Sequence, residues 1–264
     1  MKIIISPAKK MNRKEEELSE ITRPVFYEEA CQLREELKKM DFGDLKALWN
    51  CNEKIAEENQ ERLRRFAMDQ NLTGAVLAYE GIQYQYMAPA VFGAEESEYI
   101  QEHLRILSGF YGVLKPFDGV VPYRLEMQAK ASDAGDLYRF WGGKLYREVV
   151  RDDTGDPLCG RGTDGESRKG AVIVNLASKE YSRCIEKYIQ PEDAFITVTF
   201  GELVDRKVKQ KGTYAKMARG EMVRYLAELQ AEEPDKIKGF DRLGYRFAEE
   251  LSTEKEYVFL KQEG

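Results

Sequence analysis

The sequence contains a single histidine, His103, among its 264 residues. One histidine excludes a zinc site built from several histidines, and it excludes the H-E-x-x-H motif of metalloproteases. A Ser-His-Asp or Cys-His catalytic arrangement would depend entirely on this residue. His103 lies in a segment with helical spacing, and the sequence indicates no partner that would orient it. We therefore expect it to be structural or exposed rather than catalytic.

Cysteine is also scarce. The four cysteines are Cys31, Cys51, Cys159 and Cys184. No two of them are close enough in sequence for a C-x-x-C motif or a zinc knuckle. Four cysteines in a chain of this length are too few for a disulfide scaffold, so we expect reduced thiols, as in cytoplasmic proteins.

Long apolar runs and an excess of positive charge are missing as well. No window approaches the 18 apolar residues of a membrane-spanning helix, and the apolar run Ile3 to Ile5 is too short for a signal peptide. We expect a cytoplasmic protein with no membrane partner. The net charge is −6, so binding to nucleic acid would require a local basic patch.

The remaining composition is that of a soluble globular protein, with 42% hydrophobic and 33% charged residues. Strand and helix patterns alternate early in the chain, and antiparallel pairs follow late. Neither G-x-G-x-x-G nor a P-loop motif is present, which argues against a doubly wound nucleotide fold. We predict a single domain over residues 1–264, of mixed α/β (α+β) class, with a mixed sheet flanked by helices.

The element boundaries follow from hydrophobic spacing and from turn residues. Strands are predicted at residues 3–5, 74–79, 110–114, 120–125, 171–176, 195–200, 207–211, 244–247 and 257–260. Helices are predicted at residues 26–40, 44–67, 98–107, 136–150, 178–188 and 213–229. The glycine-rich segment 151–170 is predicted to be a flexible loop within the same domain.

Two predicted strands end with similar polar residues. Ser6 and Lys9 follow the first strand, and Asn175, Ser178 and Lys179 end and follow a later one. In open sheets, polar groups beyond the carboxyl ends of the strands form the usual ligand crevice. This predicts a shared pocket with hydroxyl and ammonium groups. The alternative is that serine and asparagine cap the next helix while lysine is solvated.

The segment 121–127 alternates between apolar and polar residues. If it is extended, Arg124 and Glu126 point to the same side. Such a pair could hold an anion and supply a base, or it could be an ordinary ion pair on a solvated face.

Two further segments have both functional and structural interpretations. Gly109 and Gly112 could form a tight hairpin whose N–H groups meet a phosphate, or a plain turn between elements. In the segment 137–144, Trp141 and its aromatic neighbours could stack on bases beside Lys144, or they could belong to the core.

The strongest local charge lies in residues 205–219. This segment contains one acid, Asp205, and six cations: Arg206, Lys207, Lys209, Lys211, Lys216 and Arg219. Lys216 and Arg219 share a face near the start of the predicted helix, where Thr213 is the expected N-cap. A helix start with free N–H groups and two cations is suited to an anion. The alternative is a solvated hairpin.

Seven blocks of the sequence carry a resemblance to a known family. They are I-S-P-A-K at 5–9, L-R-I-L-S-G-F-Y-G-V-L-K-P at 104–116, P-Y-R-L-E-M at 122–127, L-Y-R-F-W-G at 137–142, N-L-A-S-K-E-Y at 175–181, Y-A-K-M-A-R-G at 214–220 and G-F-D-R-L-G-Y at 239–245. In this order they are similar to the YaaA peroxide-stress-response family. The match covers nearly the whole chain.

The resemblance implies a cytoplasmic protein of the hydrogen-peroxide response that limits iron-dependent damage. It also implies a basic cleft, a helix-hairpin-helix-like element at Ser108 to Lys115, and binding to double-stranded DNA without sequence specificity. The implied DNA- and anion-binding residues are Lys9, Lys115, Arg124, Lys144, Lys216 and Arg219, with Tyr214 and Trp141 as stacking groups. Lys115 stands where the family has arginine, which keeps the charge but loses bidentate phosphate geometry. The 151–170 loop looks longer than is usual in the family.

The alternative to DNA binding is an enzyme that acts on a nucleotide or another phosphorylated small molecule. Its catalytic candidates are Glu126, Asn175 and Ser178, because a plain DNA clamp needs only cations. A long open basic groove would favour DNA, whereas a closed pocket holding Glu126 with Arg124 and Lys216 would favour the enzyme.

No metal or cofactor is expected. Direct iron binding would need a carboxylate cage, for which the sequence offers Asp152, Asp153 and Asp156. We therefore expect any effect on iron to be indirect.

Overall fold

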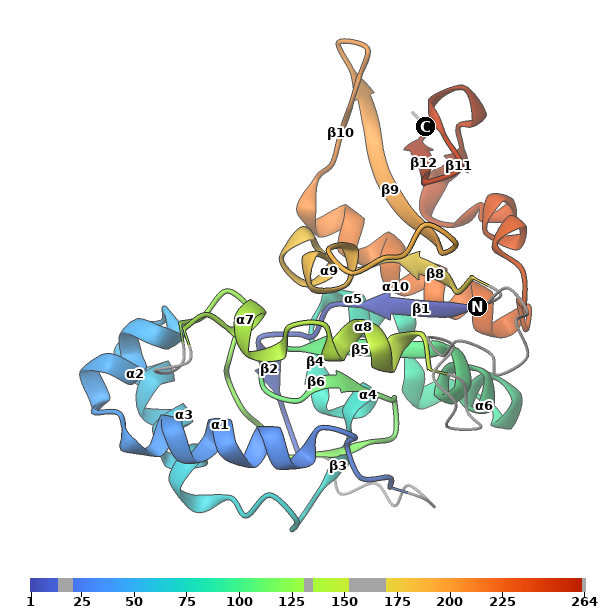
Figure 1. The fold of residues 1–264 in the computed structure, drawn as a ribbon. Helices are drawn as coiled ribbons and strands as arrows, with labels where there is room; N and C mark the ends of the chain where they lie inside the picture. Colours follow the sequence, from blue (N-terminus) through green and yellow to red (C-terminus); the bar gives the residue numbers. More distant parts are fainter. Residues whose placement is uncertain (14–20, 131–134, 152–169, 263–264) are drawn as a thin grey trace.

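A computed structural model describes residues 1–13, 21–130, 135–151 and 170–262 (Figure 1). The strands of the main sheet are β1 (Lys2–Ile5), β5 (Leu104–Ser108), β6 (Gly112–Leu114), β8 (Val172–Asn175), β9 (Ala194–Val204), β10 (Lys207–Lys209), β11 (Tyr245–Phe247) and β12 (Glu256–Lys261). Two short pairs lie outside it: β2 (Lys10–Met11) with β4 (Tyr79–Glu80), and β3 (Thr73–Gly74) with β7 (Gly119–Val120).

The helices alternate with these strands along the chain. The α-helices are α1 (Tyr27–Lys39), α2 (Phe42–Trp49), α3 (Glu53–Arg65), α4 (Ala75–Ala78), α5 (Ile82–Met87), α6 (Ala94–His103), α7 (Leu137–Trp141), α8 (Lys144–Val149), α9 (Lys179–Glu186) and α10 (Gly212–Glu228). Short 3₁₀ helices are η1 (Pro89–Val91), η2 (Pro234–Gly239), η3 (Arg242–Gly244) and η4 (Glu249–Leu251).

The main sheet is mixed, as predicted. Within the described residues its order is β11-β12-β9-β8-β1-β5-β6, and β10 pairs with β9. The central strands β12, β9, β8, β1 and β5 are parallel to their neighbours. The strands β6, β10 and β11 add antiparallel partners. β1 lies in the middle, and its residues Ile3, Ile4 and Ile5 are fully buried, as a β-branched run between two helical layers should be.

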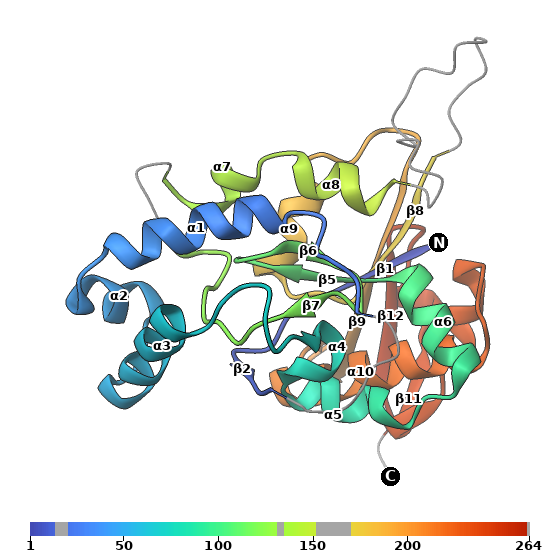
Figure 2. The ribbon, with the colours of Figure 1, turned by 90° about the horizontal axis from the view of Figure 1, so that it is seen from below.

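Helices cover both faces of the sheet. α1, α7, α8 and α9 lie over one face, and α4, α5, α6 and α10 lie over the other (Figure 2). The strands β9 and β10 continue beyond these layers as a two-stranded arm (Figure 1). The predicted hairpins at β9–β10 and β11–β12 are both confirmed.

Three predicted elements have the wrong type. The strand predicted at 120–125 forms only at Val120, the end of β7, and residues 121–126 have no regular secondary structure. The segment 74–79, predicted as a strand, forms the short helix α4 between the two-residue strands β3 and β4. The prediction failed because the periodicity of a short apolar run does not distinguish a buried helix from a strand. The helix predicted at 98–107 is wrong beyond His103, since Leu104–Ser108 forms β5 beside β1.

Two predicted long helices are each broken in two. Asn50 adopts a left-handed conformation with φ 43°, and Asn52 then caps α3, so the segment 44–67 forms parts of α2 and α3. Gly142 adopts φ 50° and separates α7 from α8.

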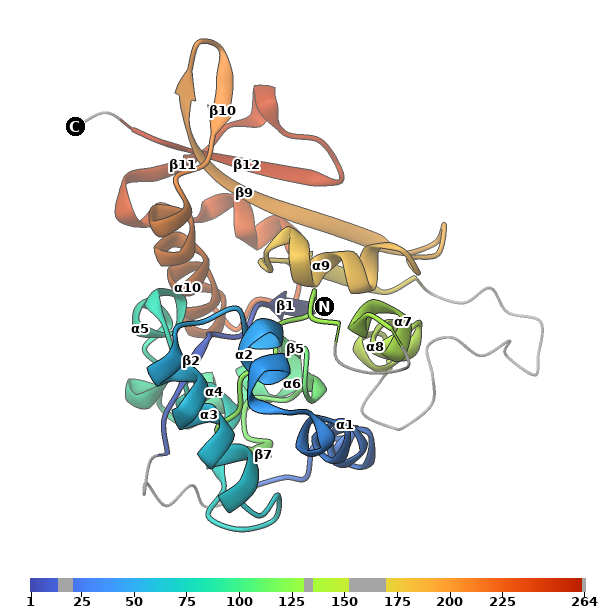
Figure 3. The same cartoon turned by 90° about the vertical axis from the view of Figure 1, so that its left-hand side faces the viewer.

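The helices α5 and α10 pack closely against each other (Figure 3). Gly220 makes this approach possible: a Cβ at this position would lie 2.1 Å from the carbonyl oxygen of Gln83 and 2.9 Å from the amide nitrogen of Met87. Both neighbours are backbone atoms, so no side-chain rotation could relieve the clash. The spacing between these two helices therefore depends on glycine at position 220.

We predict that Gly220→Ala lowers the free energy of unfolding by about 1–3 kcal/mol, because α5 and α10 must separate to admit the methyl group. Urea unfolding would measure the change. Gly212→Ala is the matched control in the same helix, since a Cβ at position 212 meets nothing within 4 Å. Equal stability of the two variants would contradict this account of the helix packing.

A buried carboxylate ties the turn after β6 to the N-terminal segment. Asp118 accepts hydrogen bonds from the Lys115 amide at 2.8 Å and from the Thr22 hydroxyl at 2.7 Å. Burial raises the pKa of Asp118 to about 6, and these hydrogen bonds only partly offset that rise. The folded protein therefore binds more protons here than the unfolded chain does between about pH 4 and pH 6.

It follows that the contribution of Asp118 to stability decreases as the pH rises through this range. We predict that the advantage of wild type over Asp118→Asn in the free energy of unfolding shrinks by about 1–3 kcal/mol between about pH 4 and pH 6.5. Urea titrations of both proteins at several pH values would measure it. A difference that stays constant over the range would contradict the raised pKa.

Candidate functional site

The carboxyl ends of β1 and β8 meet at one edge of the sheet. The hydroxyl oxygen of Ser6, just after β1, accepts a hydrogen bond from the Ser178 amide at 2.8 Å. The Ser6 hydroxyl also donates to the Ser178 hydroxyl at 3.2 Å, although the two residues are 172 positions apart. Ser178 is the N-cap residue of α9, but its side chain makes no capping bond to the helix. The two strand ends with similar sequences are thus direct neighbours.

A cavity of about 500 Å³ opens at this edge of the sheet. Its walls come from the segment after β1, the helix α5, residues 123–126, the start of α9, and α10. The volume lies in the range of small-molecule sites. Its position is the usual one for ligands of open parallel sheets, because the chain leaves β1 toward β5 on one side and returns to β8 on the other.

Three charged residues form a cluster in the cavity wall. Glu126 lies 2.8 Å from the ammonium group of Lys9 and 3.6 Å from the guanidinium of Arg124. Arg124 also donates from Nε to the Trp49 carbonyl oxygen at 3.2 Å. The side chains of Arg124 and Glu126 are only 11% and 16% exposed, so this is not an ion pair on a solvated face. Both belong to the cavity.

The opposite wall carries two cations from α10. Lys216 and Arg219 both line the cavity, so they share a face as their spacing predicts. The Nε atom of Arg219 is buried, and no hydrogen bond or ion pair joins this residue to any other described residue. Burial lowers the pKa of Arg219. The expected cap at Thr213 is not formed, because α10 begins at Gly212 and no side chain caps it.

Tyrosine hydroxyl groups lie beneath the cavity. The hydroxyl of Tyr123 shares hydrogen bonds with Tyr79 at 2.7 Å and with Ser108 at 2.6 Å. Tyr84 donates to the carbonyl oxygen of Ser6 at 3.0 Å. Burial raises the pKa of Tyr123 to about 12, so its hydroxyl stays protonated near neutral pH.

Asn175 does not reach the cavity. It is 3% exposed, its Nδ2 donates to the Thr197 hydroxyl at 3.2 Å, and its Oδ1 accepts from the Ala177 amide at 2.9 Å. These bonds shape the turn that leads from β8 to α9. The structure thus gives Asn175 a positioning role and not the expected contact with a ligand.

Three other expected binding residues also lie elsewhere. Lys144 forms an ion pair with Glu29 at 3.1 Å, and Lys115 follows β6 at the turn held by Asp118. Trp141 is 1% exposed and donates from Nε1 to the Gly109 carbonyl oxygen at 3.0 Å. Its expected role in stacking on bases does not hold in this structure, because both faces of its ring are in the core.

The segment Ser108 to Lys115 forms a hairpin between β5 and β6, but the hairpin is buried up to Leu114. The amides of Phe110 and Tyr111 donate to the Ser108 hydroxyl oxygen at 3.1 and 2.8 Å. A Cβ at Gly109 would lie 2.6 Å from the Leu125 carbonyl oxygen. These two amides are therefore not available to a phosphate, contrary to the expectation for this element.

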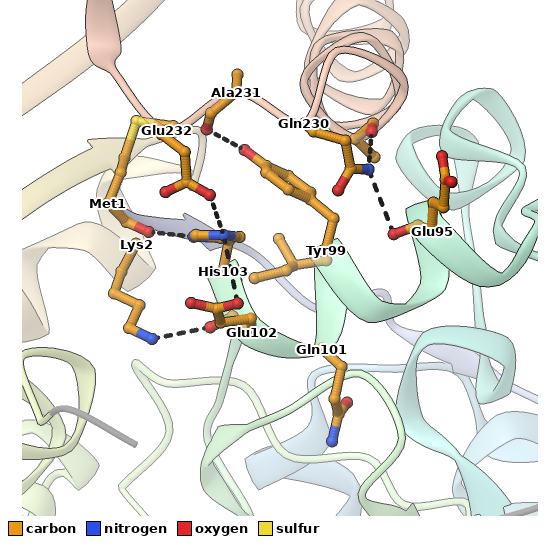
Figure 4. A network of polar contacts seen from close by, with 12 residues as sticks. Met1, Lys2, Glu95, Tyr99, Gln101, Glu102, His103, Gln230, Ala231 and Glu232 are labelled. Atoms are coloured by element: carbon orange, nitrogen blue, oxygen red, sulfur yellow. Dashed lines mark hydrogen bonds and ion pairs between the residues drawn. The ribbon is translucent and has the colours of Figure 1, made fainter. Parts of the chain in front are cut away.

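His103 lies in a structural network at the N-terminus and not among the cavity residues (Figure 4). Its Nδ1 is 2.8 Å from the Met1 carbonyl oxygen, and its Nε2 faces the carboxylates of Glu232 at 3.5 Å and Glu102 at 3.8 Å. The ring packs on Tyr99 with 4.3 Å between centroids. Met1 and Glu232 come from distant segments, so the sequence did not indicate them as partners.

Some expectations fall on parts of the chain without a description. Most of the loop at 151–170, with Asp152, Asp153 and Asp156, lies outside the described residues. Among the residues that are described, no three histidine, cysteine, aspartate or glutamate side chains come together in a way that could hold a metal ion. No helix in this part of the chain is long and apolar enough to cross a membrane.

Several cavity residues were not expected from the sequence. Gln83 and Tyr84 come from α5, and Glu180 and Tyr181 come from the first turn of α9. Glu180 and Tyr181 belong to the block N-L-A-S-K-E-Y, so the position of that block after a strand was a usable signal. Gln83 and Tyr84 had none, because α5 reaches the cavity only through its packing on α10.

The fold defines an α/β protein with a cavity lined by charged and polar side chains at the carboxyl edge of a mostly parallel sheet. The family model described as peroxide stress protein YaaA matches residues 1–251. The chain belongs to this family, as the seven sequence blocks predict.

Relatives match over nearly their full lengths. The chain is 53% identical to a UPF0246 protein of Agathobacter rectalis over 98% of each chain. It is 50% identical to a UPF0246 protein of Lachnoclostridium phytofermentans, which covers 100% of this chain and 97% of the relative. It is 46% identical to a UPF0246 protein of Pediococcus pentosaceus, covering 100% and 99%.

The hydrogen bonds of Asn175 generate a prediction about its role. Asn175→Ala should lower the free energy of unfolding by about 1–3 kcal/mol, because the buried Ala177 amide and Thr197 hydroxyl each lose a partner. Chemical denaturation would measure this. Unchanged stability would show that the turn after β8 does not depend on this side chain.

Proposed function

We propose that this peroxide-stress-family protein binds a phosphorylated small molecule in the cavity at the ends of β1 and β8 and acts on it as an enzyme. The observation that carries the proposal is Arg219, which lines the cavity, has a buried Nε atom and forms no hydrogen bond or ion pair with any described residue. Burying a charge without a partner is costly, so a residue kept in this state points to a ligand of opposite charge. Lys216 on the same wall adds a second donor that has no ion pair with any described residue.

The volume of the cavity, about 500 Å³, favours a small molecule over an extended polymer. Glu126, Arg124 and Lys216 line one cavity, which is the arrangement expected for the enzyme. Glu126 is the candidate for proton transfer, and its carboxylate is held by Lys9 and Arg124. An anionic ligand that competes for these cations would free Glu126 to act as a base. Ser178, hydrogen bonded to Ser6, contributes a hydroxyl group to the same cavity.

We predict that pyrophosphate, as a simple probe, binds to wild type and that Arg219→Gln weakens its affinity about tenfold or more, because a charge-assisted hydrogen bond is lost. Isothermal titration calorimetry at low salt would measure this. Lys207→Gln on the arm is the control, since it removes one positive charge outside the cavity, and its affinity should stay within about twofold of wild type.

Two results would contradict this proposal. One is that Arg219→Gln and Lys207→Gln bind pyrophosphate equally well. The other is that wild type does not bind pyrophosphate or other phosphorylated compounds at low salt.

The second candidate function is binding to double-stranded DNA without sequence specificity, which would help to limit iron-dependent damage. Tyr214 supports it: this side chain is 41% exposed at the start of α10, and the ammonium groups of Lys261 and Lys211 lie 4.1 and 5.9 Å from its ring centroid. Exposed aromatic rings beside cations are typical of nucleic-acid surfaces. However, Lys209 and Lys211 are ion paired with Asp205 and Glu202, which reduces the positive charge of the arm.

We predict that a labelled DNA duplex binds with an affinity that falls steeply as salt rises, because phosphate contacts dominate such binding. Fluorescence anisotropy at two salt concentrations would show it. The double variant Arg206→Gln/Lys207→Gln tests the arm, and Lys216→Ala/Arg219→Ala tests the cavity. A DNA surface on the arm predicts that the first variant lowers both affinity and salt slope, the slope by about 1–2. Absence of binding at low salt would rule out this function.

A further inference from the structure

The cavity contains charges of both signs that have no ion pair with any described residue. Arg219 has no hydrogen bond or ion pair with any described residue, and Glu180 has no ion pair within the same part of the chain. Among the other charged groups of the cavity, Lys9 and Arg124 are paired with Glu126, and Lys10 with Glu80 at 2.6 Å. Lys216, on the same helix as Arg219, has no ion pair with a described residue. The cations of α10 are therefore available to an anion, and Glu180 is available to a further hydrogen-bond donor.

These two groups come from opposite sides of the molecule. Glu180 lies in α9, which covers one face of the sheet, and Arg219 lies in α10, which covers the other face beside α5 (Figure 2). They approach the carboxyl edge of the sheet from the two sides, with the cavity between them. A ligand that satisfies both must carry an anionic group at one end and a hydrogen-bond donor at the other.

The wall around Glu180 is suited to a flat heteroaromatic ring. Tyr181, which follows Glu180 in α9, and Tyr123 line the same cavity as Glu180. The Gln128 amide donates to Oε1 of Glu180 at 3.4 Å, which orients the carboxylate. Burial and the nearby carboxylate of Glu126 raise the pKa of Glu180, as expected for an acid that has no cation of its own. Carboxylates accept hydrogen bonds from the exocyclic amino groups of bases, and aromatic side chains stack on their rings.

We propose that the ligand is a nucleoside monophosphate with an amino-bearing base, its phosphate at Arg219 and Lys216 and its base amino group at Glu180. This inference rests on the proposed phosphate binding and adds the recognition of the base. Lys9 and the Ser6-Ser178 pair line the same cavity and offer polar groups to a ribose.

Cytidine and uridine 5′-monophosphates provide a sharp test, because cytosine presents an amino donor where uracil presents a carbonyl acceptor. Calorimetric titrations of the full chain should give about tenfold tighter binding of the cytidine and adenosine nucleotides than of the uridine nucleotide. Glu180→Gln should abolish this preference, because a glutamine amide can donate to the uracil carbonyl as well as accept. Arg219→Gln should weaken all three nucleotides and ribose 5-phosphate together.

The ratio of affinities within one variant does not depend on how well that variant folds. Glu57→Gln, on the exposed surface of α3, is the control for the loss of one negative charge and should keep the wild-type ratio. If cytidine, uridine and ribose phosphates all bind equally to wild type, base recognition is wrong while phosphate binding stands. If none of the phosphorylated compounds binds, both proposals fail.

Discussion

The parallel pairing of β1 with β8 is the constraint on which the site depends. The run of three buried isoleucines makes β1 a central strand, and a central strand has neighbours on both sides. Because β5 and β8 both run parallel to it, their helices must cross over the faces of the sheet, and the carboxyl ends collect at one edge. Ser6 and Ser178 are hydrogen bonded at this edge, and both line the cavity.

The charges of the cavity are the second feature that needs a physical explanation. A folded protein gains nothing from a buried guanidinium without a partner, since its desolvation is not offset by any interaction. Arg219 precedes Gly220, where α10 approaches α5 closely, and the Glu126 carboxylate of the same cavity is already paired with Lys9 and Arg124. The positive charge of Arg219 is thus left without a partner among the described residues, and a bound anion would provide one. In the proposed function, an anion that binds at Arg219 would therefore also raise the free energy of unfolding.

Sequence reasoning could locate much of the site because its signals were local. The alternation at 121–127 predicted the common side of Arg124 and Glu126, and the i,i+3 spacing predicted that of Lys216 and Arg219. It could not predict whether a side chain is buried or faces the cavity when that depends on tertiary packing. Trp141 and Asn175 look the same in sequence whether they face a ligand or the core, and the short apolar run at 74–79 fits a buried helix as well as a strand. Glu180 becomes a candidate binding residue only in the structure, where Glu126 is ion paired with Lys9 and Arg124 and Glu180 has no ion pair with a described residue.

A crystal structure of the protein grown with cytidine 5′-monophosphate would test the central claim most directly. The account predicts phosphate oxygens within hydrogen-bonding distance of the Arg219 guanidinium and the base amino group at the Glu180 carboxylate, with β1 and β8 still joined through Ser6 and Ser178. A structure in which Arg219 pairs with a carboxylate of the protein, and the nucleotide lies elsewhere, would contradict it.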